Sequence, residues 1–136
     1  MTGASWKTER VAGPDLDVDE VLDVYRSSGL GERRPIDETE RFVAMVRQAN
    51  LVVVARVDGR LIGIARSVSD FSYVTYLSDI AVRAEYQRQG VGRALVEATR
   101  GEAPAAKIVL LSAPAATDYY PHIGFTQHHS AWVLNP

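Results

Sequence analysis

The chain has 136 residues, 46% of them hydrophobic and 24% charged, which is typical of one globular domain spanning residues 1–136. Its net charge of -2 provides no basic field to attract nucleic acid or an anionic membrane, so neither partner is expected. The absence of cysteine excludes disulfides, thiolate catalysis and cysteine-bound metals. Since the N-terminus has no apolar signal segment and no apolar run could cross a bilayer, the expected location is the cytoplasm.

The N-terminal part of the chain predicts a strand followed by two helices. Residues 5–11 are compatible with a short strand. Apolar residues then recur every three or four positions from Val18 to Tyr25, the period of an amphipathic helix, and Gly29 ends this pattern. A second helix is expected to begin near Asp37, because that side chain can cap it and a glutamate follows three residues later.

The middle of the chain predicts an antiparallel sheet. Residues 51–57 and 61–68 are rich in β-branched side chains. They are joined by Asp58-Gly59, which is a strong signal for a two-residue hairpin turn. Residues 73–82 follow after a short turn and extend the sheet as a further antiparallel strand.

The C-terminal part alternates between helices and strands. A helix is expected over residues 90–100, followed over residues 107–111 by a short apolar strand of the kind that lies inside a sheet. One or two helical turns should form within residues 116–124, and a last strand over residues 125–134. The predicted order, β-α-α-β-β-β-α-β-α-β, indicates an α/β (α+β) fold with a mixed, mostly antiparallel central sheet flanked by helices.

Two glycines, Gly90 and Gly92, stand where the helix of residues 90–100 begins, although glycine is a poor helix former. A glycine-flanked turn before a helix indicates an anion bound by the backbone amides of the helix N-terminus. The spacing excludes a dinucleotide-binding G-x-G-x-x-G, which needs a small residue at Leu95, and a P-loop, which needs Lys-Ser/Thr after its last glycine. The alternative is a junction whose glycines only ease packing.

The residues around these glycines resemble a known family. The motifs that carry the resemblance are Ile80-Ala81-Val82, then Gln87, Gly90 and Gly92, and further on Tyr119-Tyr120 and, after three residues, Gly124-Phe125. In this order they resemble the GCN5-related N-acetyltransferases (GNAT family), whose central motif is Arg/Gln-x-x-Gly-x-Gly/Ala. The resemblance covers about residues 51–134. It implies a sheet that is splayed beside the acetyl-CoA-binding strand, with a diphosphate bound at the two glycines.

The resemblance implies acetyl-CoA as co-substrate, and no spacing of histidines and carboxylates indicates a metal. In the family, the strand before the glycines carries a bulge, and the pantetheine arm pairs with its exposed backbone. Amides and arginine side chains at the helix start would hold the diphosphate. The residues thus implied in coenzyme binding are Ile80, Ala81, Val82, Gln87, Arg88, Gln89, Gly90, Val91, Gly92 and Arg93.

The catalytic roles that the resemblance implies are proton transfers. Tyr120 occupies the family position that protonates the departing thiolate, and a phenol with a pKa of about 10 is protonated at neutral pH. The alternative is a packing aromatic, the role expected of Tyr119. Asp79, on the strand beside the reaction centre, is a candidate base acting through water, or otherwise a solvated or hydrogen-bonded strand carboxylate. Ala113 stands where many members carry an asparagine, which leaves the binding of the thiol end open.

The acceptor site implied by the resemblance draws on the loop between the first two helices and on nearby strands. These segments offer Arg33, Tyr73 and Tyr76 as substrate-binding residues, which suit a small primary amine carrying a carboxylate or phosphate. A solvated loop is the alternative for Arg33. Two other functions stay open: acetylation of a protein lysine or N-terminus, and a non-catalytic acyl-CoA-sensing module. Trp132, expected near a sheet edge, favours a homodimer.

Overall fold

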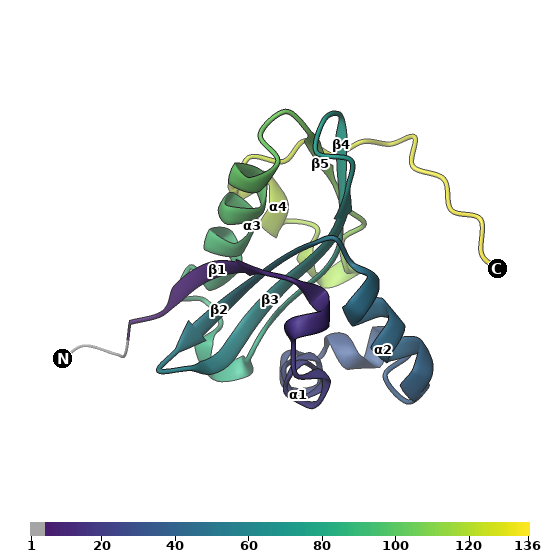
Figure 1. Ribbon diagram of the computed structural model, residues 1–136. Helices are drawn as coiled ribbons and strands as arrows, with labels where there is room; N and C mark the ends of the chain where they lie inside the picture. Colours follow the sequence, from purple (N-terminus) through teal and green to yellow (C-terminus); the bar gives the residue numbers. More distant parts are fainter. Residues whose placement is uncertain (1–4) are drawn as a thin grey trace.

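The computed structural model describes residues 5–136 and shows a five-stranded sheet with helices on both faces (Figure 1). The sheet order is β1-β2-β3-β4-β5, and neighbouring strands are antiparallel except for β5, which runs parallel to β4. The strands are β1 (Lys7–Val11), β2 (Leu51–Val57), β3 (Arg60–Ser69), β4 (Val74–Val82) and β5 (Lys107–Val109). The α-helices are α1 (Val18–Ser28), α2 (Thr39–Gln48), α3 (Val91–Glu102) and α4 (Tyr119–His122), and the 3₁₀ turns are η1 (Gly13–Asp15), η2 (Leu30–Arg33), η3 (Ala84–Tyr86) and η4 (Pro114–Ala116).

Short-range signals explain the boundaries of α1 and of the β2–β3 hairpin. The carboxylate of Asp17 accepts hydrogen bonds from the first-turn amides of α1, and Gly29 ends the helix at a left-handed φ of 88°. Asp58 and Gly59 both have positive φ, which is the geometry of the predicted two-residue turn. The capping prediction for α2 is wrong. Asp37 belongs to a turn that ends before the helix, so Glu38 takes the N-cap position and no side chain caps α2.

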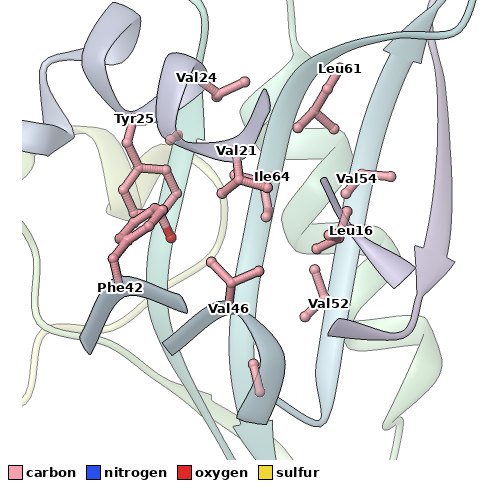
Figure 2. Packing of buried hydrophobic residues seen from close by; sticks show 12 residues of the cluster. Leu16, Val21, Val24, Tyr25, Phe42, Val46, Val52, Val54, Leu61 and Ile64 are labelled. Carbon is pink, nitrogen blue, oxygen red and sulfur yellow. The ribbon is translucent and has the colours of Figure 1, made fainter. Parts of the chain in front are cut away.

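The sheet is covered on both faces, so the residues of β2 and β3 are buried almost without interruption. Helices α1 and α2 cover one face, where Tyr25 and Phe42 pack edge to face with their ring centroids 5.2 Å apart (Figure 2). Helix α3 covers the other face, where Leu95 packs with β2 and β3. The sheet therefore lies between two helical layers. Strands β4 and β5 lie at the side of the sheet opposite β1.

Strand β4 carries a β-bulge at Ser78. Arg66 of β3 lies opposite Asp79 and Ser67 lies opposite Leu77, so Ser78 is an extra residue of β4. Regular alternation would place Leu77 and Asp79 on the same face. Instead Leu77 belongs to the core beneath α3, whereas Asp79 contacts α1 on the opposite face.

The sheet is splayed between β4 and β5, as the resemblance implies. Strand β5 pairs with β4 only along Val74–Tyr76. From Leu77 to Val82, no strand among residues 5–136 pairs with that edge of β4, whose other edge stays bonded to β3. A stretch of β4 with an open backbone edge therefore begins at the bulge.

Two predictions for the C-terminal part are wrong. Residues 125–136 contain no strand, and Trp132 and Leu134 are 92% and 98% exposed, since this segment runs away from the sheet (Figure 1, yellow). A strand needs an edge to pair with, and in the described part of the chain nothing pairs with the outer edge of β5. For the same reason β5 is an edge strand and not an inner one, and Val109 is 42% exposed.

No helix of the described residues is both long enough and apolar enough to cross a membrane.

Candidate active site

A cleft of about 620 Å³ lies where β4 and β5 separate. Its walls come from the end of α1 with η2, the bulged half of β4, the start of α3, and the segment between β5 and the end of α4. Apolar side chains such as Leu77, Ile80 and Leu110 form its middle. The cleft thus connects the N-terminus of α3 at one end with the α1–η2 corner at the other.

The loop between β4 and α3 is held by its own glutamines. The Gln87 side-chain amide donates to the carbonyl of Val82 (2.9 Å), and that of Gln89 donates to the carbonyl of Glu85 (3.1 Å). Arg88 and Gly90 have left-handed φ angles of 63° and 87°. A loop that turns in this way makes a concavity of backbone amides, which is a suitable site for an anion.

The N-terminus of α3 continues this concavity. Gly90 is the N-cap, and no side chain caps the helix. The first intrahelical hydrogen bond runs from the Ala94 amide to the Gly90 carbonyl (3.0 Å), so the preceding amides need an acceptor from outside the helix. Arg88 and Arg93 line the same end of the cleft and add positive charge. These groups fit the diphosphate of a coenzyme.

The two glycines of this loop serve different purposes. A Cβ at Gly90 would meet nothing within 4 Å, so glycine is needed there for its left-handed backbone. A Cβ at Gly92 would lie 3.2 Å from the Tyr119 hydroxyl oxygen, so glycine allows that ring to approach the first turn of α3. The alternative that both glycines only ease packing therefore fits Gly92 and not Gly90.

Tyr120 lines the cleft from α4. Its ring packs edge to face against Tyr119 (5.2 Å between centroids) and Phe125 (5.4 Å). Burial raises the pKa of the Tyr120 phenol above its ordinary value, and the neighbouring Tyr119 raises it further. The hydroxyl is therefore protonated throughout the neutral range, as a proton donor must be.

Asp79 lies outside the cleft, in a buried network of hydrogen bonds. Its carboxylate has no exposed surface and accepts from Arg66 Nε (2.6 Å), from Arg34 Nε (2.5 Å) and from the Tyr25 hydroxyl (2.6 Å). Burial would raise the pKa of Asp79. The charges of Arg66 and Arg34 and the hydrogen bonds from Arg66 and Tyr25 outweigh burial and hold the pKa below its usual value.

These contacts argue against Asp79 as the general base. A base must reach the substrate, directly or through one water, and must accept a proton near neutral pH. Asp79 meets neither requirement, because it does not line the cleft and its lone pairs are engaged. The same network instead fixes the bulge, since Arg34 Nη2 donates to the Ser78 carbonyl (2.8 Å) and Arg66 Nη2 to its hydroxyl (2.9 Å).

The structure places only one of the three predicted acceptor residues in the cleft. Arg33 lines it from η2. Tyr73 and Tyr76 do not line it, because they lie where β4 is still near or paired with β5, before the bulge opens the sheet. Tyr73 is 65% exposed and accepts a hydrogen bond from Lys107 Nζ (3.0 Å). The prediction that these tyrosines contact the substrate is therefore not supported by the geometry.

Most of the residues predicted for coenzyme binding do meet in the cleft. Gln89 and Val91 do not line it, and Val91 is turned into the core with 1% exposure. The predicted residues that line the cleft are Ile80, Ala81, Val82, Gln87, Arg88, Gly90, Gly92 and Arg93.

Sequence reasoning missed the wall opposite β4. Leu110 and Leu111 line the cleft there, although their pattern predicts only a buried strand, and Ala113, at the position where many family members carry an asparagine, lines the same wall. Ser28 and Gly29 line its other end, where the left-handed Gly29 turns the chain from α1 into η2. The resemblance indicates this corner only through Arg33, and the helix-ending glycine is the local signal for Ser28 and Gly29. Among residues 5–136, no group of three or more histidine, cysteine or carboxylate side chains is placed to hold a metal ion.

Comparisons with known proteins agree with this geometry. A model of the acetyltransferase (GNAT) domain matches residues 21–134. The chain is 38% identical over 69 residues to the chloroplastic GCN5-related N-acetyltransferase 2 of Arabidopsis thaliana; the match covers 48% of this chain and 27% of that protein. The chain thus spans well under half the length of this curated relative.

Solved structures share the whole fold at low sequence identity. A GNAT-family acetyltransferase of Streptococcus pneumoniae has a TM-score of 0.74 at 18% identity, and the match covers 97% of this chain and 100% of that one. The aminoglycoside N-acetyltransferase AAC(6′)-Iy, solved in complex with CoA, has a TM-score of 0.71 at 17% identity, with 99% and 97% covered. Because the domain match spans most of the chain, the chain belongs to the acetyltransferase (GNAT) family.

Proposed function

We propose that residues 1–136 act as one domain that transfers an acetyl group from acetyl-CoA directly to a primary amine of a small molecule. The observation that carries this proposal is the cleft. Its lining includes the uncapped N-terminus of α3, the part of β4 with an open edge, and Tyr120. A cytoplasmic location, where acetyl-CoA is made and used, belongs to the same proposal.

The residues present fit acetyl-CoA as co-substrate. The diphosphate would accept hydrogen bonds from the first-turn amides of α3 and pair with Arg88 and Arg93. The pantetheine arm carries amides of its own, which match the open backbone edge of β4 near Ile80 and Val82. When bound, acetyl-CoA supplies the activated acetyl group, and the contacts of the protein with the coenzyme orient this group.

Acetyl transfer needs two proton movements. The amine nitrogen forms a bond to the acetyl carbonyl carbon, the carbon–sulfur bond breaks, and the thiolate gains a proton; we propose that Tyr120, which lines the cleft, donates it. The ammonium proton must also leave. Since the cleft-lining residues of the described chain include no carboxylate and no histidine, we propose that water accepts this proton.

Three kinds of acceptor remain in view. A small amine is favoured because the cleft is a bounded cavity with an apolar middle. An aminoglycoside is a second candidate, because AAC(6′)-Iy, which shares the fold, is described as an aminoglycoside N-acetyltransferase. A protein amine is the third candidate. The alternative to an enzyme of any kind is a non-catalytic module that senses acyl-CoA.

The proposal is tested by measuring thiol release from acetyl-CoA in the presence of a panel of primary amines, together with acetyl-CoA affinity. We expect release with some members of the panel. Gly90→Val should weaken acetyl-CoA binding by about tenfold or more, because valine disfavours the left-handed backbone that aims the amides at the diphosphate.

The matched control is Gly101→Ala. Gly101 lies in α3 with no left-handed φ and nothing within 4 Å of its Cβ position, so affinity should not change. Unchanged affinity in a folded Gly90→Val protein would place the diphosphate elsewhere. Tight acetyl-CoA binding without thiol release for any amine would favour the sensing module.

We also propose that the protein forms a homodimer. The C-terminal segment exposes Trp132 and Leu134, and the outer edge of β5 stays unpaired in the described structure beside the half-exposed Val109 and Leu111. Unpaired apolar edges commonly gain a strand from another chain.

Light scattering should therefore give the mass of a dimer, and truncation after Ser130 should give a monomer. Removal of Asn135 and Pro136 alone should leave the dimer intact, whereas a monomeric parent at high concentration would contradict the proposal.

A further inference from the structure

The charged side chains that line the cleft in the described part of the chain are all arginines. The ionisable groups that line it include Arg33, Arg34, Arg88 and Arg93, and among the cleft-lining residues of the described chain there is no aspartate or glutamate. An anionic group on the acceptor can therefore pair with a guanidinium in this cleft. A second cationic group would find no carboxylate to pair with. The question is which arginines are available to it.

Arg88 and Arg93 lie at the α3 end, where the proposed function assigns them to the coenzyme diphosphate. Arg34 lies at the other end, but its guanidinium is fully engaged. Nε donates to Asp79 (2.5 Å), Nη2 to the Ser78 carbonyl (2.8 Å) and Nη1 to the Arg33 carbonyl (2.8 Å). Arg34 is therefore a structural residue that holds η2 against the bulge of β4.

Arg33 differs from its neighbour. Its backbone lies at the end of η2, which follows the left-handed Gly29, and its carbonyl accepts a hydrogen bond from Arg34. Its side chain is exposed and lines the cleft, and no ion pair of residues 5–136 includes it. A guanidinium without a carboxylate partner faces the end of the cleft that the coenzyme phosphates do not use.

We infer that the acceptor is an amine that also carries an anionic group, a carboxylate or a phosphate, and that Arg33 binds this group. The inference rests on the proposed function and narrows its acceptor. A planar guanidinium forms two parallel hydrogen bonds to such a group, which orients the amine toward the thioester as well as attracting it. A polycationic amine such as an aminoglycoside meets the opposite situation, since its further ammonium groups face Arg33 without a counter-charge.

The test compares acceptors in matched sets by thiol release from acetyl-CoA. Each set contains an amino carboxylate, its carboxamide, a diamine of the same length and an aminoalkyl phosphate, and an aminoglycoside is added. We expect kcat/KM to be about 10- to 100-fold higher for the preferred anionic member than for the carboxamide, the usual value of a hydrogen bond to a charged group. The carboxylate and phosphate arms identify which anion the site takes.

Variants separate Arg33 from a general charge effect. Arg33→Gln should raise KM for the anionic acceptor about 10-fold or more, with kcat little changed. The KM for acetyl-CoA and the kcat/KM for the carboxamide should not change. Arg33→Lys should restore part of the lost activity toward the anionic acceptor. Arg47→Gln, which removes an exposed arginine of α2 that does not line the cleft, should change none of these values. Equal kcat/KM for anionic and uncharged members, or equal losses for both in Arg33→Gln, would overturn the inference and leave the acetyltransferase proposal standing. Thiol release from no amine of any set would overturn both.

Discussion

Replacing Asp79 with asparagine is expected to lower the free energy of unfolding by about 3–5 kcal/mol, the usual cost of breaking a buried ion pair from one side. Asparagine preserves the shape of the side chain but removes the charge that faces Arg66 and Arg34. The Arg66 side chain is only 10% exposed, so its guanidinium would be left buried without a counter-charge. Thermal unfolding should show a midpoint about 10–15 °C below that of the parent.

The control is Glu102→Gln, which removes the exposed ion pair between Arg10 and Glu102 (3.3 Å). This change should cost no more than about 1 kcal/mol. An Asp79→Asn protein as stable as the parent would show that the network does not hold the fold. If the Asp79→Asn protein folds and binds acetyl-CoA normally but has lost all turnover, Asp79 has a catalytic role instead.

The same carboxylate should make stability depend on acidity. The pKa of Asp79 is lowered in the folded protein, so below about pH 4 the unfolded chain binds the proton more readily than the folded one. The stability that Asp79 contributes is complete above its unfolded pKa and is lost as the pH falls through its folded pKa. Asp79→Asn lacks this component, so its unfolding free energy should fall less steeply than that of the parent over this acid range.

The second large effect is expected at Tyr120, where phenylalanine should lower turnover by about 10²–10⁴-fold, the usual contribution of a positioned general acid. The substitution removes one hydroxyl and keeps the edge-to-face contacts with Tyr119 and Phe125. Affinity for acetyl-CoA should change little, because the phenol matters mainly as charge develops on the sulfur. The measurement is single-turnover acetyl transfer, so that slow product release cannot hide the loss.

Tyr119→Phe is the internal control for Tyr120→Phe. The Tyr119 hydroxyl lies beside the Cβ position of Gly92 at the start of α3, so its removal should affect acetyl-CoA affinity at most. The pKa of Tyr120 is raised by burial, so parent turnover should fall only above about pH 10, as the phenol ionises. If both phenylalanine variants turn over like the parent, Tyr120 is a packing residue and water protonates the thiolate.

Features with a short-range cause were predictable from the sequence. The β2–β3 hairpin follows from the positive φ that Asp58 and Gly59 tolerate, and the start of α1 follows from the Asp17 carboxylate, which bonds to amides only two and three residues away. The coenzyme end of the cleft was predictable for a similar reason. Its glycine loop and helix start are contiguous in the chain, and the family motif describes that contiguous stretch.

Features that depend on distant partners were not predictable. The Asp79 network joins Tyr25, Arg34 and Arg66 from three other elements, so no local pattern distinguishes it from a solvated carboxylate. The strand predicted over residues 125–134 also depends on a distant partner: its β-forming residues pair with no strand, and the outer edge of β5 stays unpaired in the described chain. Tyr73 and Tyr76 were misplaced because the point where β4 and β5 separate depends on pairing between segments about thirty residues apart.

The extra residue in β4 separates what the chain needs to fold from what it needs to hold a ligand. Deleting Ser78 would leave Leu77 facing α3 and Asp79 facing α1, because an ordinary strand alternates in just that way. The core and the buried charges would keep their partners, while the bend that accompanies a bulge would disappear. A chain shorter by this one residue could therefore stay folded with a narrower opening beside β4. Deletion or insertion of one residue in β4, and not only substitution of side chains, can therefore remove or restore the binding cleft of this fold.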